Sequence, residues 1–185
     1  MASDQFVFAY GSLVPDLRGE RSSVMPACRL RDHRRVWNVA MDNSVTLPQY
    51  KHYLDARDSS RPDVLVTFLN LRPAPGHDVN GVLVQVGDAE LLALDRRERN
   101  YERRDVSAAI EPACDGRVWT YFGRAEACLR FAEGAQIGRA VVDRSYLDSV
   151  RAGFASLGPD ALSAFEASTD AHTCRVLDLL RVDLD

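Results

Sequence analysis

The feature that most constrains the fold of this chain is a set of short apolar runs rich in β-branched and aromatic residues. Each run is bounded by turn-forming residues, which is typical of buried strands of roughly four to eight residues. A Pro-Gly-rich turn that ends in Asn80-Gly81 separates the last two runs. We therefore predict strands over Gln5–Tyr10, Val36–Met41, Val64–Leu71 and Gly81–Val86.

Amphipathic helices are predicted mainly in the second half of the chain. Asp88 is a good N-cap for a helix that ends near Arg99, and Asp143 is a good N-cap for a second helix that stops at Gly158-Pro159. The apolar stripe of the second helix consists of Leu147, Val150, Phe154 and Leu157. A weaker helical segment covers 125–133, and another short helix follows Asp160.

Asp115-Gly116 is a strong β-hairpin signal between the runs 107–113 and 117–122. Because strands and helices are partly segregated along the chain, the fold class is α+β around a mixed or antiparallel sheet. The length of 185 residues predicts one domain over 1–185.

The segment 42–62 is polar, contains Pro48 and Pro62, and lacks steady periodicity, so we predict a long loop. It carries Tyr50, His52 and Tyr53, whose side chains can contact a ligand and also tolerate exposure to solvent. Two interpretations are about equally favoured: a lid over a binding site, or a surface excursion without a role.

Charge and composition exclude several classes of protein. The chain has 23 basic and 27 acidic residues, a formal charge of −4, which argues against general nucleic-acid binding. It has no apolar run long enough to span a bilayer and no signal peptide, so we expect a cytoplasmic protein. Lys51 is the only lysine, which indicates GC-rich codon usage and a bacterial source.

Metal binding is not predicted. The four histidines are scattered, and the four cysteines are far apart without a C-x-x-C pair. In a cytosolic protein such cysteines are most simply reduced core residues. The glycine patterns of the common nucleotide-binding motifs are also absent from the sequence.

Glu98 is the most informative polar residue. On a helix after Asp88 it shares one face with Leu91 and Leu94, so its carboxyl group is expected to point toward the interior. Burial raises a carboxyl pKa toward the range of a base that works near neutral pH. The competing interpretation is that the helix has already ended, or that a neighbouring arginine pairs with the carboxylate.

Three further features could complete a site. Tyr10-Gly11-Ser12-Leu13 follows the first strand, where a glycine permits a sharp turn that exposes backbone N–H groups. Tyr121 and Tyr146 could each place a hydroxyl group in the same interior, although each could equally be an amphipathic core tyrosine. Ser12 after a strand also suggests a nucleophile elbow, but Val14 stands where that motif requires a second glycine.

Taken together, these segments resemble the γ-glutamylcyclotransferase-like superfamily. The resemblance rests, in chain order, on FVFAYGSL, GVLVQV, LDRRERNYERRDV, VWTYF and SYLDSVRAGFASLGP, and it covers nearly the whole chain except 42–62 and the tail. It implies a mixed, partly closed β-barrel of about five to seven strands with flanking helices. Two departures from common family patterns are Arg99 directly after the glutamate and Leu13 directly after the serine.

The resemblance also implies an activity. Members convert a γ-glutamyl amine or amino acid to 5-oxoproline and a free amine, without a cofactor. Carried over, Glu98 would be the acid/base, the loop Tyr10, Gly11, Ser12, Leu13 would hold the γ-glutamyl group, and Tyr146, with Tyr121 as a weaker addition, would bind substrate. The partner would be this small molecule, and the protein a monomer or homodimer. A non-catalytic ligand-binding member and, less favoured, a Ser12 hydrolase stay as alternatives, and the leaving amine is open.

Overall fold

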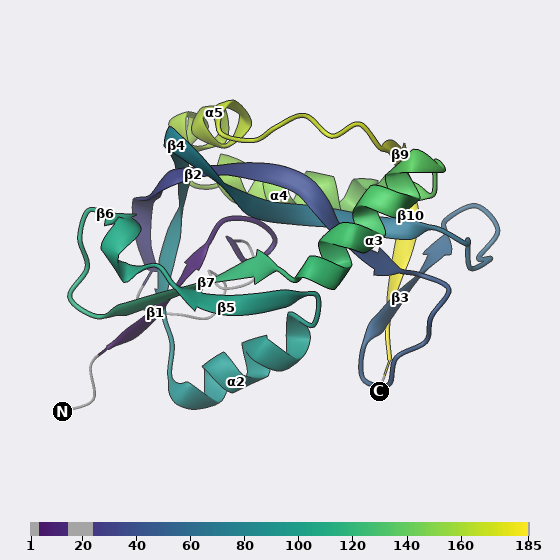
Figure 1. Ribbon diagram of the computed structural model, residues 1–185, viewed down its shortest axis with the longest axis horizontal. Helices are drawn as coiled ribbons and strands as arrows, with labels where there is room; N and C mark the ends of the chain where they lie inside the picture. The colour runs from purple at the N-terminus through teal and green to yellow at the C-terminus, as the bar shows by residue number, and fades with distance from the viewer. Residues whose placement is uncertain (1–3, 15–23, 185) are drawn as a thin grey trace.

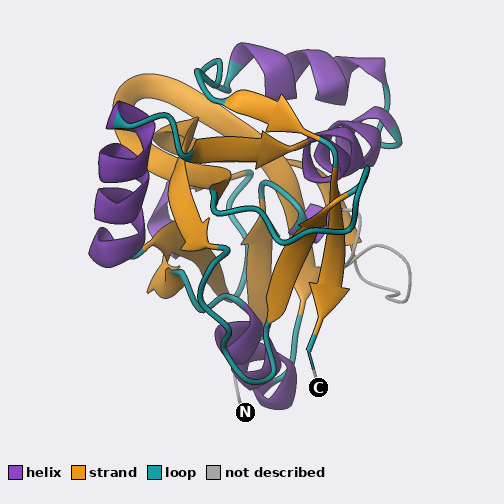
Figure 2. Ribbon diagram, turned by 90° about the vertical axis from the view of Figure 1, so that its right-hand side faces the viewer, coloured by secondary structure: helices purple, strands orange, loops and turns teal. Residues whose placement is uncertain are grey.

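The computed structural model describes residues 4–14 and 24–184. Strands curl into a half-barrel, and helices pack around its outside (Figures 1 and 2). The helices and the 3-10 turn of the described residues are α2 (Asp88–Arg97), η1 (Ser107–Ala109), α3 (Ala125–Gln136), α4 (Arg144–Ala155) and α5 (Pro159–Ala167). The strands are β1 (Gln5–Ala9), β2 (Val24–Asp42), β3 (Lys51–Asp55), β4 (Leu65–Gln85), β5 (Tyr101–Asp105), β6 (Ile110–Glu111), β7 (Arg117–Gly123), β8 (Ala140–Asp143), β9 (Arg175–Leu177) and β10 (Leu179–Asp183).

The predicted α+β class with a mixed, partly closed barrel is confirmed. The main sheet has the strand order β5-β7-β1-β4-β2-β6, and β8 pairs with β4 and β9. It is mixed because β1 runs antiparallel to β4 and parallel to β7. Its eight strands slightly exceed the five to seven expected, since the sequence gives no clear signal for strands as short as β6 and β9.

The predicted turn before Gly81 is instead an irregularity inside one long strand. β2 and β4 pair along most of their lengths, and the register jumps from His33 opposite Pro73 to Arg31 opposite Asp78. Gly76, in the extra length of β4 at this point, has a φ of +78°, a left-handed conformation that favours glycine. The chain therefore bulges without reversing, and the two apolar runs belong to the same strand.

The predicted hairpin at Asp115-Gly116 is wrong. β7 pairs antiparallel with β5, whereas the short β6 pairs with β2. The Asp-Gly pair does reverse the chain, but the N–H of Arg117 then bonds to the carbonyl of Asp4, which places β7 beside β1. The local turn signal was real, and a distant strand took the place of the expected partner.

The prediction of a long loop over 42–62 is also wrong in part. β3 lies within it and pairs antiparallel with β10 from the end of the chain. The buried Asn43 side chain fixes the entry to this pair, because its amide group donates to the carbonyl of Tyr53 and accepts from the N–H of Tyr53. A strand that pairs only with a segment more than a hundred residues later leaves little local signal in the sequence.

The helices lie where they were predicted, with one correction at a cap. Asp88 is the first residue of α2 and not its N-cap: Gly87 takes that place, and the Asp88 carboxylate accepts a hydrogen bond from the side-chain amide of Gln5.

Asp143 caps α4, where its carboxylate accepts from the hydroxyl of Ser145 and from the N–H of Tyr146. Val150 and Phe154 of the predicted stripe are fully buried, and Phe154 stacks on Phe165 of α5 with ring centroids 4.6 Å apart. No helix among the described residues is long and apolar enough to cross a membrane.

β1 packs tightly against Gly81 of β4. A Cβ atom at this position would clash with the carbonyl oxygen of Ala9 and would lie 2.6 Å from the ring of Phe8. Gly87, the N-cap of α2, has an extended backbone that suits a serine, and a Cβ there would make only an ordinary contact, 3.8 Å from the Glu90 carboxylate.

We predict that Gly81→Ser lowers the free energy of unfolding by about 1–3 kcal/mol or more, because β1 must shift to admit the side chain. Gly87→Ser, the same substitution at an open position, should change it by less than about 0.5 kcal/mol. Urea denaturation of the two variants and the wild type measures both values. Equal stability of the two variants would contradict the close packing at Gly81.

Candidate active site

The predicted site residues meet in one narrow pocket at the end of β1. Its wall combines the loop after β1 with side chains from α2, β5, β7, α4 and the middle of β4. The lining residues are Phe8, Tyr10, Gly11, Ser12, Leu13, Leu69, Glu98, Tyr101, Thr120, Tyr121 and Tyr146. All seven residues singled out from the sequence are among them.

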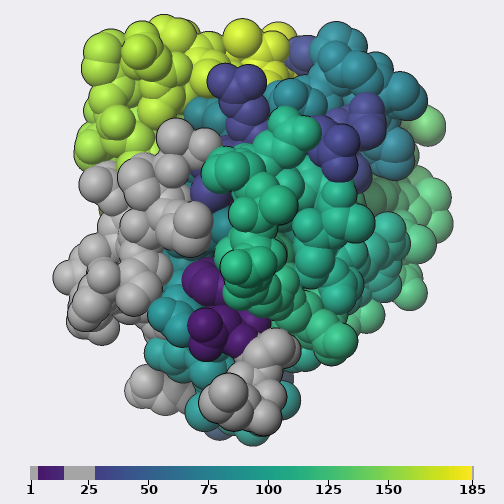
Figure 3. All heavy atoms as spheres, turned by 90° about the vertical axis from the view of Figure 1, so that its left-hand side faces the viewer, coloured from purple at the N-terminus to yellow at the C-terminus, as the bar shows by residue number. Residues whose placement is uncertain are grey.

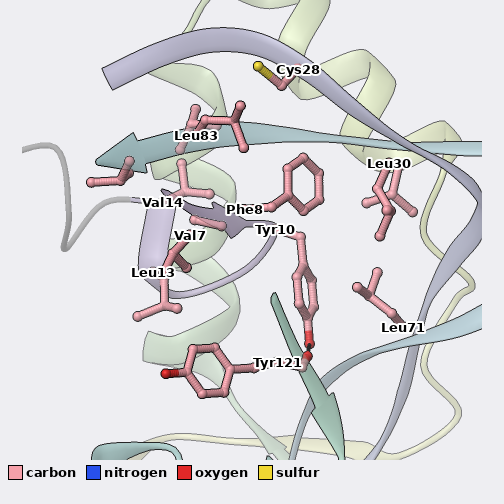
Figure 4. Close-up of a cluster of buried hydrophobic side chains, with 14 of the residues drawn as sticks. Val7, Phe8, Tyr10, Leu13, Val14, Cys28, Leu30, Leu71, Leu83 and Tyr121 are labelled. Atoms are coloured by element: carbon pink, nitrogen blue, oxygen red, sulfur yellow. Dashed lines mark hydrogen bonds between the residues drawn. The ribbon is translucent and has the colours of Figure 1, made fainter. Parts of the chain in front are cut away.

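The loop after β1 forms one wall. Tyr10 is buried, and its hydroxyl group donates to the backbone carbonyl of Tyr121 over 2.7 Å (Figure 4). The carbonyl of Gly11 accepts from the N–H of Val14 over 2.9 Å, which begins a turn. Gly11 does not have a positive φ, and a Cβ there would lie 3.7 Å from the Tyr146 hydroxyl oxygen. The absence of a side chain therefore keeps the pocket open and is not required by the backbone.

Glu98 enters the pocket from the end of α2. The helix stops at Arg97, and Glu98 is its C-cap, with its N–H bonded to the carbonyl of Leu94. Its carbonyl accepts from the N–H of Tyr101, and this turn leads directly into β5. The side chain is 17% exposed and lies 3.3 Å from the guanidinium of Arg97. The helix has therefore ended before Glu98, and a neighbouring arginine does pair with the carboxylate, yet Glu98 still lines the pocket.

Tyr146 reaches the pocket from the first turn of α4. Its hydroxyl oxygen accepts from the N–H of Leu69 at 3.4 Å and is also hydrogen-bonded to Ser12. The rings of Trp37 and Phe68 pack edge-on against its ring. Burial raises the pKa of Tyr146, so the hydroxyl group is neutral at ordinary pH and available as a hydrogen-bond donor or acceptor.

Tyr121 contributes its ring to the wall of the pocket, while its hydroxyl group is hydrogen-bonded outside the pocket lining. That hydroxyl donates to Asp95 of α2 over 2.9 Å, and Asp95 also pairs with Arg103 of β5. This arrangement joins three elements around the pocket. Figure 4 shows the Tyr121 and Tyr10 rings on the same side of the core cluster.

Tyr101 is the site residue that sequence reasoning missed. It begins β5, and its hydroxyl group donates to the carbonyl of Leu69 over 2.6 Å. The available signal was its position, three residues after Glu98 in the same charged segment. Burial, together with the neighbouring Tyr10 and Tyr146, raises the pKa of Tyr101 well above its usual range.

The two tyrosines of the 42–62 segment have different environments. Tyr53 is 2% exposed and belongs to a second apolar cluster, so its predicted role as a ligand contact is wrong. Tyr50 is partly exposed; its hydroxyl accepts from the side-chain amide of Asn100, and Arg99 lies over its ring. Burial and the charge of Glu98 raise the pKa of Tyr50 to about 12.

Lys51 follows Tyr50 at the start of β3. Its ammonium group lies 4.5 Å from the centroid of the Phe68 ring and 5.7 Å from that of Tyr50. Burial and the positive charge of Arg181 lower the pKa of Lys51 to about 8, and the negative charge of Glu98 offsets part of this shift. The surroundings of Glu98 on this side are therefore basic.

Residues that could hold a metal ion do not gather in the described part of the chain, where histidine, cysteine and carboxylate side chains form no group of three or more. All four cysteines are free thiols, but the prediction that they are core residues holds only for Cys28, because the other three are partly exposed. The polar groups of the pocket are thus one carboxylate, several hydroxyls and the loop backbone.

A curled mixed sheet with helices outside it, and a carboxylate facing a strand-end loop across a small pocket, define an α+β fold of the γ-glutamyl cyclotransferase type. The family model of AIG2-like γ-glutamyl cyclotransferases matches residues 7–137, so the chain belongs to this family. The matched region includes the loop after β1, Glu98 and Tyr121, while Tyr146 lies beyond it.

Solved structures confirm the fold at low sequence identity. A γ-glutamyl cyclotransferase is 15% identical, with a TM-score of 0.54 over 94% of this chain and 93% of that one. A human protein described as uncharacterised is 16% identical, with a TM-score of 0.55 over 95% and 94%. A yeast γ-glutamyl cyclotransferase specific to glutathione is 14% identical, with a TM-score of 0.55 over 90% and 97%. No curated protein sequence in the comparison matches the chain significantly.

The buried tyrosines of the pocket predict an alkaline loss of stability. An unfolded tyrosine ionises near pH 10, whereas Tyr101 keeps its proton in the fold. Above pH 10 the unfolded state therefore binds fewer protons than the folded state, and the free energy of unfolding falls as the pH rises. Each such tyrosine contributes a slope of about 1.4 kcal/mol per pH unit.

We expect the free energy of unfolding of Tyr101→Phe to fall less steeply above pH 10 than that of the wild type. The two slopes should differ by the contribution of about one proton, because phenylalanine has no proton to lose. Urea denaturation between pH 8 and pH 11.5 measures the two slopes. Parallel curves for the two proteins would show that Tyr101 is not protected from ionisation.

Proposed function

We propose that this protein is a cyclotransferase that converts a γ-glutamyl amine or γ-glutamyl amino acid to 5-oxoproline and a free amine. The observation that carries the proposal is that Glu98 and the loop Tyr10–Leu13, distant in sequence, line the same pocket. Membership in the AIG2-like family supports the reaction class.

The reaction needs a folded substrate and one group that moves a proton. The α-amino nitrogen of the γ-glutamyl group attacks the γ-carbonyl carbon, a new C–N bond closes the five-membered ring, and the C–N bond to the leaving amine breaks. Glu98 accepts the proton that the attacking nitrogen loses and returns it to the departing nitrogen. Holding the two reacting atoms together accounts for roughly 7–11 kcal/mol of the barrier when their alignment is good.

The remaining pocket groups bind and orient. The backbone N–H groups of the loop are donors for the α-carboxylate or the developing oxyanion. The neutral Tyr146 hydroxyl, hydrogen-bonded to Ser12, is a donor or acceptor for the γ-glutamyl group. The pocket contains no histidine among its lining residues, so Ser12 has no imidazole to activate it as a nucleophile.

Tyr50 and its neighbours form the candidate leaving-group side. Lys51 and Arg99 both lie against the Tyr50 ring, and Arg99 directly follows Glu98 in the chain. A basic environment beside the acid/base favours a leaving amine that also carries a carboxylate. We therefore propose γ-glutamyl amino acids ahead of simple γ-glutamyl amines.

Glu98→Gln keeps the size of the side chain and removes its ability to accept a proton. We expect kcat/KM to fall about 10²–10⁴-fold, with the fold intact by circular dichroism. The assay is the formation of 5-oxoproline from a panel of γ-glutamyl compounds that includes glutathione. Glu102→Gln, at a more exposed carboxylate that pairs with Arg104 on β5, is the matched control and should retain wild-type activity.

Near wild-type activity in Glu98→Gln would contradict the mechanism. If the wild-type protein binds γ-glutamyl compounds but forms no 5-oxoproline, the ligand-binding alternative replaces the enzyme. An added acyl mass on the intact protein during turnover would instead favour the Ser12 hydrolase.

Tyr50→Ala should change the ranking of leaving amines. Its loss frees Lys51 and Arg99 from the ring that holds them, so the preference for carboxylate-bearing amines over neutral amines should shift by about 1–3 kcal/mol in kcat/KM. Tyr53→Phe, within the same segment but in the core, is the control and should leave the ranking unchanged. The same ranking in Tyr50→Ala and the wild type would exclude this segment from the substrate site.

A further inference from the structure

Arg35, in the middle of β2, is a fully buried cation outside the proposed chemistry. It is 0% exposed, and its guanidinium carbon lies 4.9 Å from the ring centroid of Phe154 and 4.8 Å from that of Phe165. Across the described part of the chain, no carboxylate forms an ion pair with it, and all its hydrogen-bond acceptors are neutral. Burial lowers the pKa of Arg35 to about 9.

Three oxygens from different elements accept hydrogen bonds from this guanidinium. Nε donates to the carbonyl oxygen of Tyr10 over 2.7 Å, and Nη1 donates to the hydroxyl oxygen of Ser168 over 2.6 Å. Nη2 donates to the carbonyl oxygen of Asn80. Arg35 thus joins the loop after β1, the strand β4 and the C-cap of α5.

Stability alone does not explain a buried cation at this position. Burying a charge costs free energy that neutral acceptors offset only in part, and an apolar side chain of similar volume would pack against the same two phenylalanine rings without that cost. One of its three bonds goes directly to the loop that lines the pocket. That contact suggests a role in the site, beyond packing.

The bond to Tyr10 fixes the direction of the next N–H group. In a trans peptide the carbonyl of Tyr10 and the N–H of Gly11 point in opposite directions. Because the carbonyl faces Arg35, the N–H of Gly11 faces away from it, and Gly11 lines the pocket. No oxygen within 4–14 or 24–184 accepts a hydrogen bond from this N–H.

The charge of Arg35 also strengthens this donor. A hydrogen bond from a cation to a carbonyl is stronger than a neutral one, and it polarises the peptide so that its N–H donates more strongly in turn. In a site closed to water, a donor that is held in place before the ligand arrives stabilises developing negative charge effectively.

We propose that Arg35 is a positioning residue that orients and polarises the Tyr10–Gly11 peptide, so that the N–H of Gly11 donates to a carboxylate or oxyanion of the ligand. The identity of that ligand, a γ-glutamyl compound, rests on the proposed function. The orientation and polarisation of the Tyr10–Gly11 peptide do not depend on the proposed function.

The test compares Arg35→Met with two matched controls. Arg34→Met removes the neighbouring cation on β2, which bonds to Asp170 and to the carbonyl of Ala167 but not to the loop. Ser168→Ala removes another partner of Arg35 and leaves its bond to Tyr10 in place. Arg35→Lys keeps a charge on a side chain that can still reach one acceptor.

The first readout is the ¹H–¹⁵N NMR signal of the Gly11 amide, which reports on the Tyr10–Gly11 peptide without any reaction. We expect Arg35→Met to move this signal upfield, and both controls to leave it in place. Arg35→Lys should give an intermediate shift. An unchanged Gly11 signal in folded Arg35→Met would overturn the proposal. If that variant does not fold, an unchanged Gly11 signal in Arg35→Lys overturns it instead.

The second readout is binding and turnover. We expect Arg35→Met to weaken the binding of 5-oxoproline, measured by calorimetry, and to lower kcat/KM for a γ-glutamyl amino acid by about 10–100-fold. Both controls should stay within about threefold. Equal losses in Ser168→Ala and Arg35→Met would show a structural role alone. If the wild type forms no 5-oxoproline while the Gly11 signal still responds to Arg35, the proposed function fails and the positioning role stands.

Discussion

The pairing of β2 with β4 is the constraint on which the rest of the structure depends. β1 and β8 attach to β4, and β6 attaches to β2, so the main sheet is built outward from this ribbon. The ribbon also supplies Arg35 from β2 and Leu69 from β4, whose backbone contacts two pocket tyrosines. Figure 3 shows how the segment that includes β5 and β7 covers one face, with the helices α4 and α5 at its corner.

Backbone atoms organise the pocket as much as side chains do. The carbonyl of Leu69 accepts from Tyr101, its N–H donates to Tyr146, and the carbonyl of Tyr10 accepts from Arg35. Buried hydroxyl and guanidinium groups need such partners, because each unpaired polar group in the interior costs free energy. Satisfying them ties the wall of the pocket to the core.

Local signals in the sequence were sufficient where a structure is stabilised locally. The N-cap Asp143, the apolar stripe of α4 and the loop after β1 all lie where they were predicted, because a cap, a stripe and a strand end involve neighbours in sequence. The prediction that Glu98 points inward was also correct, although it rests on the C-cap turn of α2 and not on a continuing helix. Tyr101 was missed because its position three residues after Glu98 was its one local signal, and that position does not show where the side chain points.

The sequence by itself determined the fold class, the positions of the helices, the family and seven of the residues that line the pocket. Tertiary structure alone decided which strands pair, since the partners of β3 and β7 come from distant segments whose pairing energy leaves no mark on local residue patterns. It also decided the role of Arg35, which looks like any other arginine in an arginine-rich chain. Whether that charge is exposed or buried against two phenylalanine rings depends on helices that follow it by more than a hundred residues.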